Sequence, residues 1–308
     1  ETPPSLGFRH DSMGGSELLR YGYITNGLAD HTLEQGIELL ADAGYQGIGI
    51  TLDHHHLDPF QVTDSRLAEI GERLRARNLE PVIETGARYA LDPQRKHWPS
   101  LVSSNAANRQ RRVEYYRRAM EIAGAIGAKT VSLWSGVAEK GVDSEANRNH
   151  LVTALEEVLA DACASGISIG FEPEPGMVIE SLADWRWLRE QVTGTALGLT
   201  LDLGHLAVTE SAPLEVSMAT VIEDVIHVHV DDCKDGVHQH LEPGAGEIDF
   251  GPLLQLLVEQ GYSGLALVEL SRDSHRAPEL IERTIRYLQV AEAEVNSRTG
   301  NNSRKGPV

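Results

Sequence analysis

The stretch ISIGFEPEPGMVIESLADWRWLREQVTGTALGLTLDLGH, residues 167–205, contains the repeating unit on which the fold depends. Two apolar runs with strand character, Ser168–Glu172 and Gly198–Asp202, flank a longer amphipathic segment. The chain repeats this pattern, because each of eight apolar runs is followed by a segment with apolar residues at helical spacing. The predicted strands are Arg20–Thr25, Gly47–Leu52, Pro81–Thr85, Thr130–Trp134, Ser168–Glu172, Gly198–Asp202, Val225–Val230 and Leu265–Leu270.

Strict alternation of strands and helices predicts a parallel sheet, because each connection has to cross one face of the sheet. Eight units favour closure, so the expected fold class is α/β, as a single (β/α)8 TIM barrel. Glycine ends several of the predicted helices, where it allows the left-handed turn that leads back to the sheet. These glycines are Gly44, Gly127, Gly166 and Gly261.

The chain has 308 residues, of which 41% are hydrophobic, and this is enough for a large buried core. We expect residues 1–308 to form one domain, with the barrel at about 18–294 and polar tails at 1–17 and 295–308. The start of the chain lacks the basic-then-apolar order of a secretory signal, and no apolar run approaches the roughly 20 residues of a membrane span. A cytoplasmic protein without a membrane partner is therefore expected.

The balance of 27 basic against 46 acidic residues gives a formal net charge of −19. Such a charge repels polyanions, so the sequence argues against nucleic acid as a partner. A small polyhydroxylated substrate fits better, and the sequence is compatible with a homo-oligomer.

Four consecutive predicted strands end in a side chain that can bind a metal: Glu172, Asp202, His229 and Glu269. In a barrel of parallel strands these ends share one rim, so the four side chains are expected to converge. Three carboxylates and one imidazole form an oxygen-rich set. This set favours one divalent ion of Mn2+, Mg2+ or Co2+, with Zn2+ as an alternative.

At these positions the sequence resembles the xylose isomerase-like TIM barrel superfamily of sugar isomerases and epimerases, which also includes inosose dehydratases and the endonuclease IV group. The resemblance covers roughly residues 18–294. Its motifs are FEPEP around Glu172, LDLGH at 201–205, HVHVDD at 227–232, EPGAGEIDF at 242–250 and VEL around Glu269.

The resemblance implies that Glu172, Asp202, His229 and Glu269 are metal ligands and that His205 contacts substrate. A metal held between a hydroxyl and a carbonyl oxygen of a sugar would acidify the neighbouring C–H and stabilise an enediolate. Glu172 and Glu269, three strands apart, are then the expected acid and base, with His205 as the third catalytic residue. A carboxylate that binds a metal tightly is a weaker base. The alternative is therefore that one of these two carboxylates has a purely structural role.

Other polar residues follow the strand ends and are expected to bind substrate: His54, His56, Arg88, Trp134, Glu174, His238 and His240. For the histidines of the loop 54–56 the alternative is a solvated loop tip, and for Glu174 it is a solvated side chain. The segment 84–100 is a candidate lid, with Trp98 as a stacking surface. His227 is either a second imidazole ligand or a histidine of the barrel interior.

The expected function is a divalent-metal-dependent isomerase or epimerase of a sugar, keto-sugar or cyclitol. A metal-dependent dehydratase or lyase is the main alternative, because it begins with the same proton abstraction and then expels a β-oxygen. A nuclease of the endonuclease IV type is disfavoured by the charge of −19. A non-catalytic metabolite-binding barrel is disfavoured by the four intact candidate ligands.

Overall fold

The computed structural model describes residues 18–302, and the predicted N-terminal tail at 1–17 lies outside the described residues. Eight parallel strands close into a barrel in the order β1-β10-β7-β6-β5-β4-β3-β2. Their bounds are β1 Arg20–Ile24, β2 Gly47–Thr51, β3 Glu80–Glu84, β4 Thr130–Leu133, β5 Ser168–Phe171, β6 Leu197–Asp202, β7 Val225–Val230 and β10 Leu265–Val268. The (β/α)8 TIM barrel expected from the sequence is therefore confirmed.

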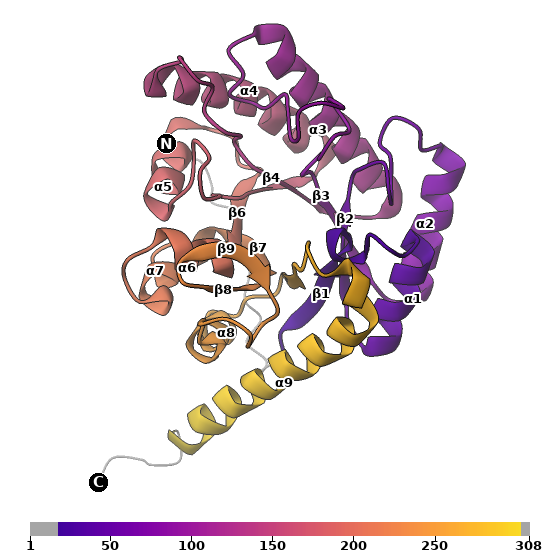
Figure 1. Cartoon of the computed structure of the whole chain (residues 1–308), viewed down its shortest axis with the longest axis vertical. Helices are drawn as coiled ribbons and strands as arrows, with labels where there is room; N and C mark the ends of the chain where they lie inside the picture. The colour runs from indigo at the N-terminus through magenta and orange to yellow at the C-terminus, as the bar shows by residue number, and fades with distance from the viewer. Residues whose placement is uncertain (1–17, 303–308) are drawn as a thin grey trace.

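Helices surround the strands on the outside of the barrel (Figure 1). The longer ones are α1 Leu33–Ala43, α2 Asp64–Ala76, α3 Ala106–Ile126, α4 Ser144–Ser165, α5 Leu182–Gln191, α8 Phe250–Glu259 and α9 Ala277–Asn302. Two short helices, α6 Leu203–Thr209 and α7 Leu214–Ala219, follow β6. Helix α9 continues to Asn302, past residue 294 where the sequence placed the end of the barrel.

The ends of the helices follow from local hydrogen bonding. The Thr32 side chain accepts the backbone N–H of Gln35, and the Gln35 side chain accepts that of Thr32, so two otherwise unpaired donors at the start of α1 are satisfied. Gly44, Gly127 and Gly166 end their helices with φ of 91°, 89° and 68°. Because side chains disfavour this backbone region, glycine is the residue expected there.

The core lies inside the barrel and between the strands and the helices. Ile48 and Ile50 of β2 are completely buried, as are Phe171 of β5 and Trp185 of α5. The rings of Phe171 and Trp185 stack with their centroids 6.3 Å apart, which ties α5 to the sheet. This packing fixes the strands, and with them the side chains at the strand ends.

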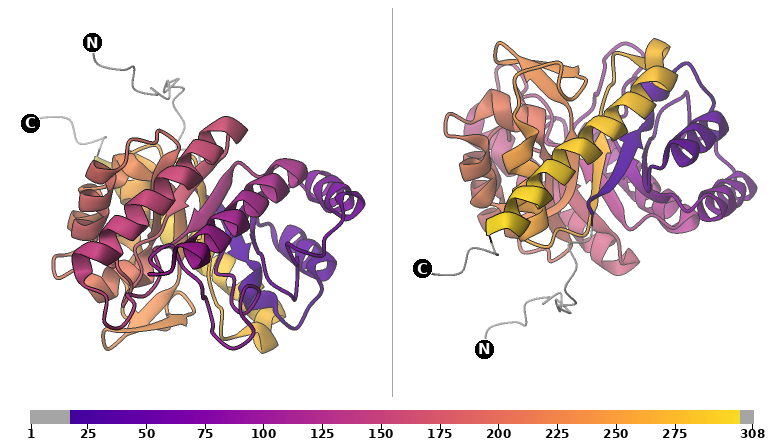
Figure 2. Two further views of the ribbon diagram at one scale, coloured as in Figure 1. Left: turned by 90° about the horizontal axis from the view of Figure 1, so that it is seen from above. Right: turned by 90° about the horizontal axis from the view of Figure 1, so that it is seen from below.

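The connection between β7 and α8 contains an antiparallel hairpin. Its strands are β8 Asp232–Lys234 and β9 Val237–Leu241, and it projects from one end of the barrel (Figure 2). The Asp232 carboxylate accepts the backbone N–H groups of Gly244, Gly246 and Ile248 at 3.0, 2.9 and 3.1 Å. These bonds hold the chain that returns from the hairpin, which gives the EPGAGEIDF motif a structural role.

Within residues 18–302, no helix combines the length and the apolar character needed to cross a membrane.

Candidate metal centre

A cavity of about 730 Å³ opens at the carboxyl ends of the strands. Most of the residues expected at the site from the sequence line it, namely Arg88, Trp134, Glu172, Glu174, His205, His229, His238, His240 and Glu269. Asp202 lies beneath them with a side chain that is fully buried. The shared rim of the strands therefore brings these residues together, as the barrel topology requires.

Glu172, Asp202, His229 and Glu269 form one cluster, with one donor atom of each residue within 4.8 Å of the others. The Nδ1 atom of His229 lies 3.1 Å from Glu172 Oε1, 3.2 Å from Glu269 Oε2 and 3.8 Å from Asp202 Oδ2. Three carboxylates thus point at a single imidazole nitrogen. Such a concentration of negative charge in a buried place needs a positive charge among the donors.

The electrostatics of the cluster follow from this crowding. Burial alone would lower the pKa of His229, but the charges of Glu172 and Glu84 hold it well above its ordinary value. Burial would likewise raise the pKa of Glu269, yet His240 and His229 hold it well below the usual range. The neighbouring histidines His240 and His229 therefore favour the ionised form of the Glu269 carboxylate.

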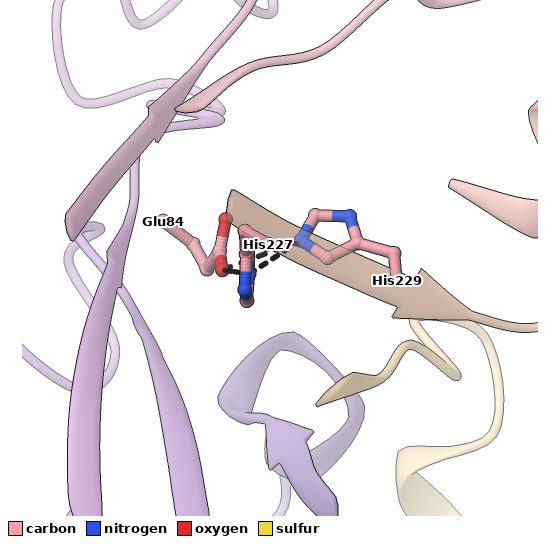
Figure 3. A group of neighbouring side chains, drawn as sticks. All are labelled: Glu84, His227 and His229. Atoms are coloured by element: carbon pink, nitrogen blue, oxygen red, sulfur yellow. Dashed lines mark hydrogen bonds and ion pairs between the residues drawn. The ribbon is translucent and has the colours of Figure 1, made fainter. Parts of the chain in front are cut away.

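Glu84, at the end of β3, is a residue of the site that sequence reasoning missed. Its Oε1 lies 3.0 Å from His227 Nε2 and 3.3 Å from His229 Nε2, and the two Nε2 atoms are 3.1 Å apart (Figure 3). Burial would raise the pKa of Glu84, but His229 and His227 lower it to about 2. An ionised Glu84 can accept the proton on His229 Nε2, which would let Nδ1 bind a cation once its own proton is displaced.

His227 is completely enclosed in the barrel interior and contacts Glu84 and His229. A signal for Glu84 was present in the sequence, because EPVIE is an apolar run that ends in a carboxylate, like the runs that end at Glu172 and Glu269. Asn26 was also missed. Its Nδ2 donates to Glu269 Oε1 at 2.8 Å, a contact between residues far apart in sequence.

His205 lies in the first turn of α6, directly after β6. Its backbone N–H donates to Asp202 Oδ1 at 2.7 Å, so the carboxylate also caps the helix. The ring Nδ1 lies 3.1 Å from the Pro173 carbonyl oxygen and the ring Nε2 lies 2.9 Å from His238 Nε2. A carbonyl accepts but does not donate, so Nδ1 carries a proton, while Nε2 contacts His238, which also lines the cavity.

The predicted lid segment contributes to the cavity, but through different residues than expected. Trp98 does not line the cavity, and the Arg95 guanidinium covers its ring at 3.2 Å from the centroid. His97 lines the cavity instead of Trp98. Its ring bonds to the Gly86 carbonyl and packs edge-on against Trp134 with centroids 5.3 Å apart.

His54 and His56, which the sequence suggested as substrate contacts, do not line the cavity. Asp53 Oδ1 accepts the backbone N–H groups of His55 and His56 at 2.8 and 3.2 Å, which turns the chain away from the mouth. His54 then pairs with Asp58 on the surface at 2.7 Å. The His56 ring lies against the backbone carbonyls of Leu28 and His31, both at 3.1 Å.

The family model described as xylose isomerase-like TIM barrel matches residues 37–290, and the chain belongs to this family. The chain is 25% identical over 227 residues to an L-ribulose-5-phosphate 3-epimerase of Shigella boydii, a match that covers 70% of this chain and 77% of that protein.

Solved structures with the same fold include a D-tagatose 3-epimerase-like protein, with a TM-score of 0.75 and 20% identity over 91% of this chain and 100% of that one. A D-allulose 3-epimerase from Methylomonas sp., solved in complex with D-allulose, has a TM-score of 0.71 and 19% identity over 89% of this chain and 97% of that one.

Proposed function

We propose that this protein is a divalent-metal-dependent epimerase or isomerase that acts on a small polyhydroxylated ketose or keto-cyclitol through an enediolate. The observation that carries the proposal is the convergence of Glu172, Asp202 and Glu269 on Nδ1 of His229 at the floor of the cavity. Membership of the xylose isomerase-like family and similarity to proteins named as sugar 3-epimerases support it.

The four donors fit a divalent ion by their chemistry. The buried Oδ2 of Asp202 has no hydrogen-bond partner among the described residues, which is costly unless a cation meets it. Three carboxylates and one imidazole favour Mn2+, Mg2+ or Co2+, while Zn2+ is an alternative. When bound, such an ion polarises a substrate carbonyl and acidifies the neighbouring C–H.

The side chains then divide the proton chemistry between them. Glu172 follows β5 and Glu269 follows β10, and β6 and β7 lie between these two strands in the barrel. We assign them to opposite faces of the reacting carbon, where one carboxylate removes the proton and the other returns it. His205, which lines the cavity, holds a substrate oxygen, and Trp134 lies under the sugar ring.

Three cationic side chains, Arg88, Lys96 and Arg272, also line the cavity. They would suit a phosphate or carboxylate at the far end of a substrate. Candidate substrates therefore include both free and phosphorylated ketoses.

A dehydratase or lyase remains the second candidate because of Glu174. This residue lines the cavity, and burial raises the pKa of its carboxyl to about 7, so part of the population is protonated at neutral pH. A protonated carboxyl beside the substrate can donate to a leaving hydroxyl. Product analysis separates the two reactions, because elimination removes water from the substrate whereas epimerisation conserves its mass.

Solvent-deuterium exchange tests the proposal. Ketoses, ketose phosphates and keto-cyclitols are incubated in D2O with and without Mn2+, and deuterium next to the carbonyl is read by NMR. We expect Mn2+-dependent exchange with at least one compound, and loss of that exchange in Asp202→Asn but not in Glu72→Gln, an exposed control on α2. Absence of metal-dependent exchange across the whole panel would contradict the proposal.

A further inference from the structure

The ring of His97 forms part of the cavity wall on the side of β3 and β4. His97 belongs to the connection between β3 and α3, and it lines the cavity together with Trp134, which follows β4. Neither β3 nor β4 carries one of the four proposed metal donors. No hydrogen bond or ion pair joins His97 to that cluster within residues 18–302, so the ring is available to a different part of a substrate.

Hydrogen bonds of the backbone and of the ring fix the direction of the imidazole. The His97 N–H donates to the Arg88 carbonyl oxygen at 2.6 Å, and the ring Nδ1 bonds to the Gly86 carbonyl oxygen. A carbonyl oxygen accepts but does not donate, so Nδ1 carries a proton. The other ring nitrogen, Nε2, makes no hydrogen bond with any of the described residues.

The surroundings of the ring keep it neutral. The pKa of His97 is lowered to about 4, mainly by burial and further by the positive charges of Lys96, Arg112 and Arg88. At neutral pH only one of the two ring nitrogens therefore holds a proton. Because Nδ1 holds it, Nε2 has a lone pair and is a hydrogen-bond acceptor.

Aromatic packing supports the ring from another side. The rings of His97 and Trp134 meet edge-on, with centroids 5.3 Å apart and an interplanar angle of 88°. Trp134 is held in turn by Arg112, a fully buried residue of α3 whose guanidinium carbon lies 4.6 Å from the centroid of the Trp134 ring. Arg112 Nη2 donates to the Thr85 carbonyl oxygen at 3.0 Å, which ties this support to the end of β3.

The backbone at His97 adopts a conformation that side chains disfavour. Its φ is 63°, and the φ values of Ala87 and Arg88, at the other end of the same segment, are 58° and 36°. Left-handed backbone at residues other than glycine persists only where the surrounding contacts determine it, and it is frequent where proteins bind ligands. The strain therefore supports a binding role for the His97 ring.

We infer that His97 is a specificity-determining residue, whose Nε2 atom accepts a hydrogen bond from a substrate hydroxyl other than the oxygens at the metal. This inference rests on the proposed function, because it takes the cavity to hold a polyhydroxylated compound. A site built to hydrogen-bond a hydroxyl discriminates against the analogue without it, since the polar group of the site is then left unpaired. His97 thus distinguishes a ketose from the deoxy analogue that lacks this one hydroxyl.

Three substitutions separate the Nε2 atom from the other contacts of the ring. His97→Asn keeps a donor for the Gly86 carbonyl but has no atom in the place of Nε2. His97→Phe keeps the ring that packs against Trp134 but has no nitrogen. His97→Gln is the conservative variant, because its longer amide places an acceptor near the position of Nε2.

Isothermal titration calorimetry of the Mn2+-loaded full chain measures the Kd of D-allulose, D-tagatose and D-fructose, and of analogues of each that lack one hydroxyl. We expect one deoxy analogue to bind the wild type about tenfold more weakly than its parent. In His97→Asn and His97→Phe the parent should lose about the same factor, and the difference between parent and analogue should disappear. His97→Gln should restore part of the difference.

The control is His275→Asn, which changes an exposed histidine that does not line the cavity and should bind every compound as the wild type does. Circular dichroism checks folding, and His97→Phe replaces His97→Asn if the latter does not fold. A folded variant without Nε2 that still discriminates between parent and analogue overturns the inference, and so does a wild-type chain that binds none of these sugars.

Deuterium exchange on the same samples separates this inference from the proposed reaction. Binding that depends on His97, without Mn2+-dependent exchange, would support the role of His97 and contradict the proposed reaction. Exchange with discrimination unchanged in the variants would support the reaction and overturn the role of His97.

Discussion

The two halves of the barrel rim differ in what they contribute to the cavity. Strands β5, β6, β7 and β10 are neighbours and end in Glu172, Asp202, His229 and Glu269, all of which can bind a metal. In the half formed by β1 to β4, two polar side chains contact these residues instead. Asn26 donates to Glu269, and Glu84 contacts His229.

We therefore propose that one half of the rim supplies the metal donors and that the other half orients them. Metal-binding histidines and carboxylates usually depend on such partners for their direction. The same contrast holds for the histidine-bearing loops. His238 and His240 follow β7 and face the cavity, whereas His54 and His56 follow β2 and face away from it.

The largest effect is expected from the donor half. Glu269→Gln removes a carboxylate that contacts His229 Nδ1 at 3.2 Å but preserves the shape of the side chain. We expect turnover to fall by about 10²–10⁴-fold, the range typical for the loss of a general acid or base. The exchange rate measures this, with circular dichroism as the check on folding. Retained activity would remove Glu269 from the catalytic residues.

A smaller effect is expected from the orienting half. Glu84→Gln preserves the volume of the side chain in the barrel interior. It replaces an ionised acceptor of the His229 Nε2 proton with a neutral amide. We expect the affinity for Mn2+ to fall by about 10–100-fold, as is usual when the partner of a metal-binding histidine is lost. Isothermal titration calorimetry measures the Kd. An unchanged Kd would mean that Glu84 has no part in orienting His229.

The pH dependence of metal binding probes the contact between the two halves. The pKa of His229 is held well above its ordinary value, chiefly by Glu172 and Glu84 acting against burial. At neutral pH the imidazole therefore carries a proton, which a cation at Nδ1 has to displace. The affinity for Mn2+ should rise by about tenfold per pH unit below this pKa, with a proton released on binding. A Kd that is constant between about pH 6 and 8 would contradict this competition.

The smallest effects are expected in the loop after β2. His54→Ala and His56→Ala should leave turnover within about twofold of wild type, because neither side chain lines the cavity. The His56 ring bonds to a backbone carbonyl at 3.1 Å, so His56→Ala should lower the free energy of unfolding by about 1 kcal/mol in urea denaturation. A large loss of turnover in either variant would show that this loop reaches the substrate.

The barrel and the convergence of the four strand-end residues could be predicted from the sequence, because both depend on periodicity and topology. An apolar run that ends in Glu172 or Asp202 places that residue at the rim once the strands are parallel. Family membership rests on the same stretches and is confirmed by the match over residues 37–290.

Other features depend on interactions that the periodic pattern of apolar residues does not reveal. The placement of His56 is decided by two hydrogen bonds from backbone N–H groups to Asp53, and that of His240 by its contact with the buried Asp231. The hairpin β8–β9 is held by Asp232 through bonds to residues more than ten positions away. Such contacts are specified by three-dimensional packing, so a linear pattern does not reveal them.

Anomalous diffraction from crystals grown with Mn2+ would show directly whether the four-residue cluster binds the metal. We predict a manganese peak within bonding distance of donor atoms from Glu172, Asp202, His229 and Glu269. A crystal in which manganese binds elsewhere on the chain, while these four side chains keep their direct contacts with one another, would contradict this prediction.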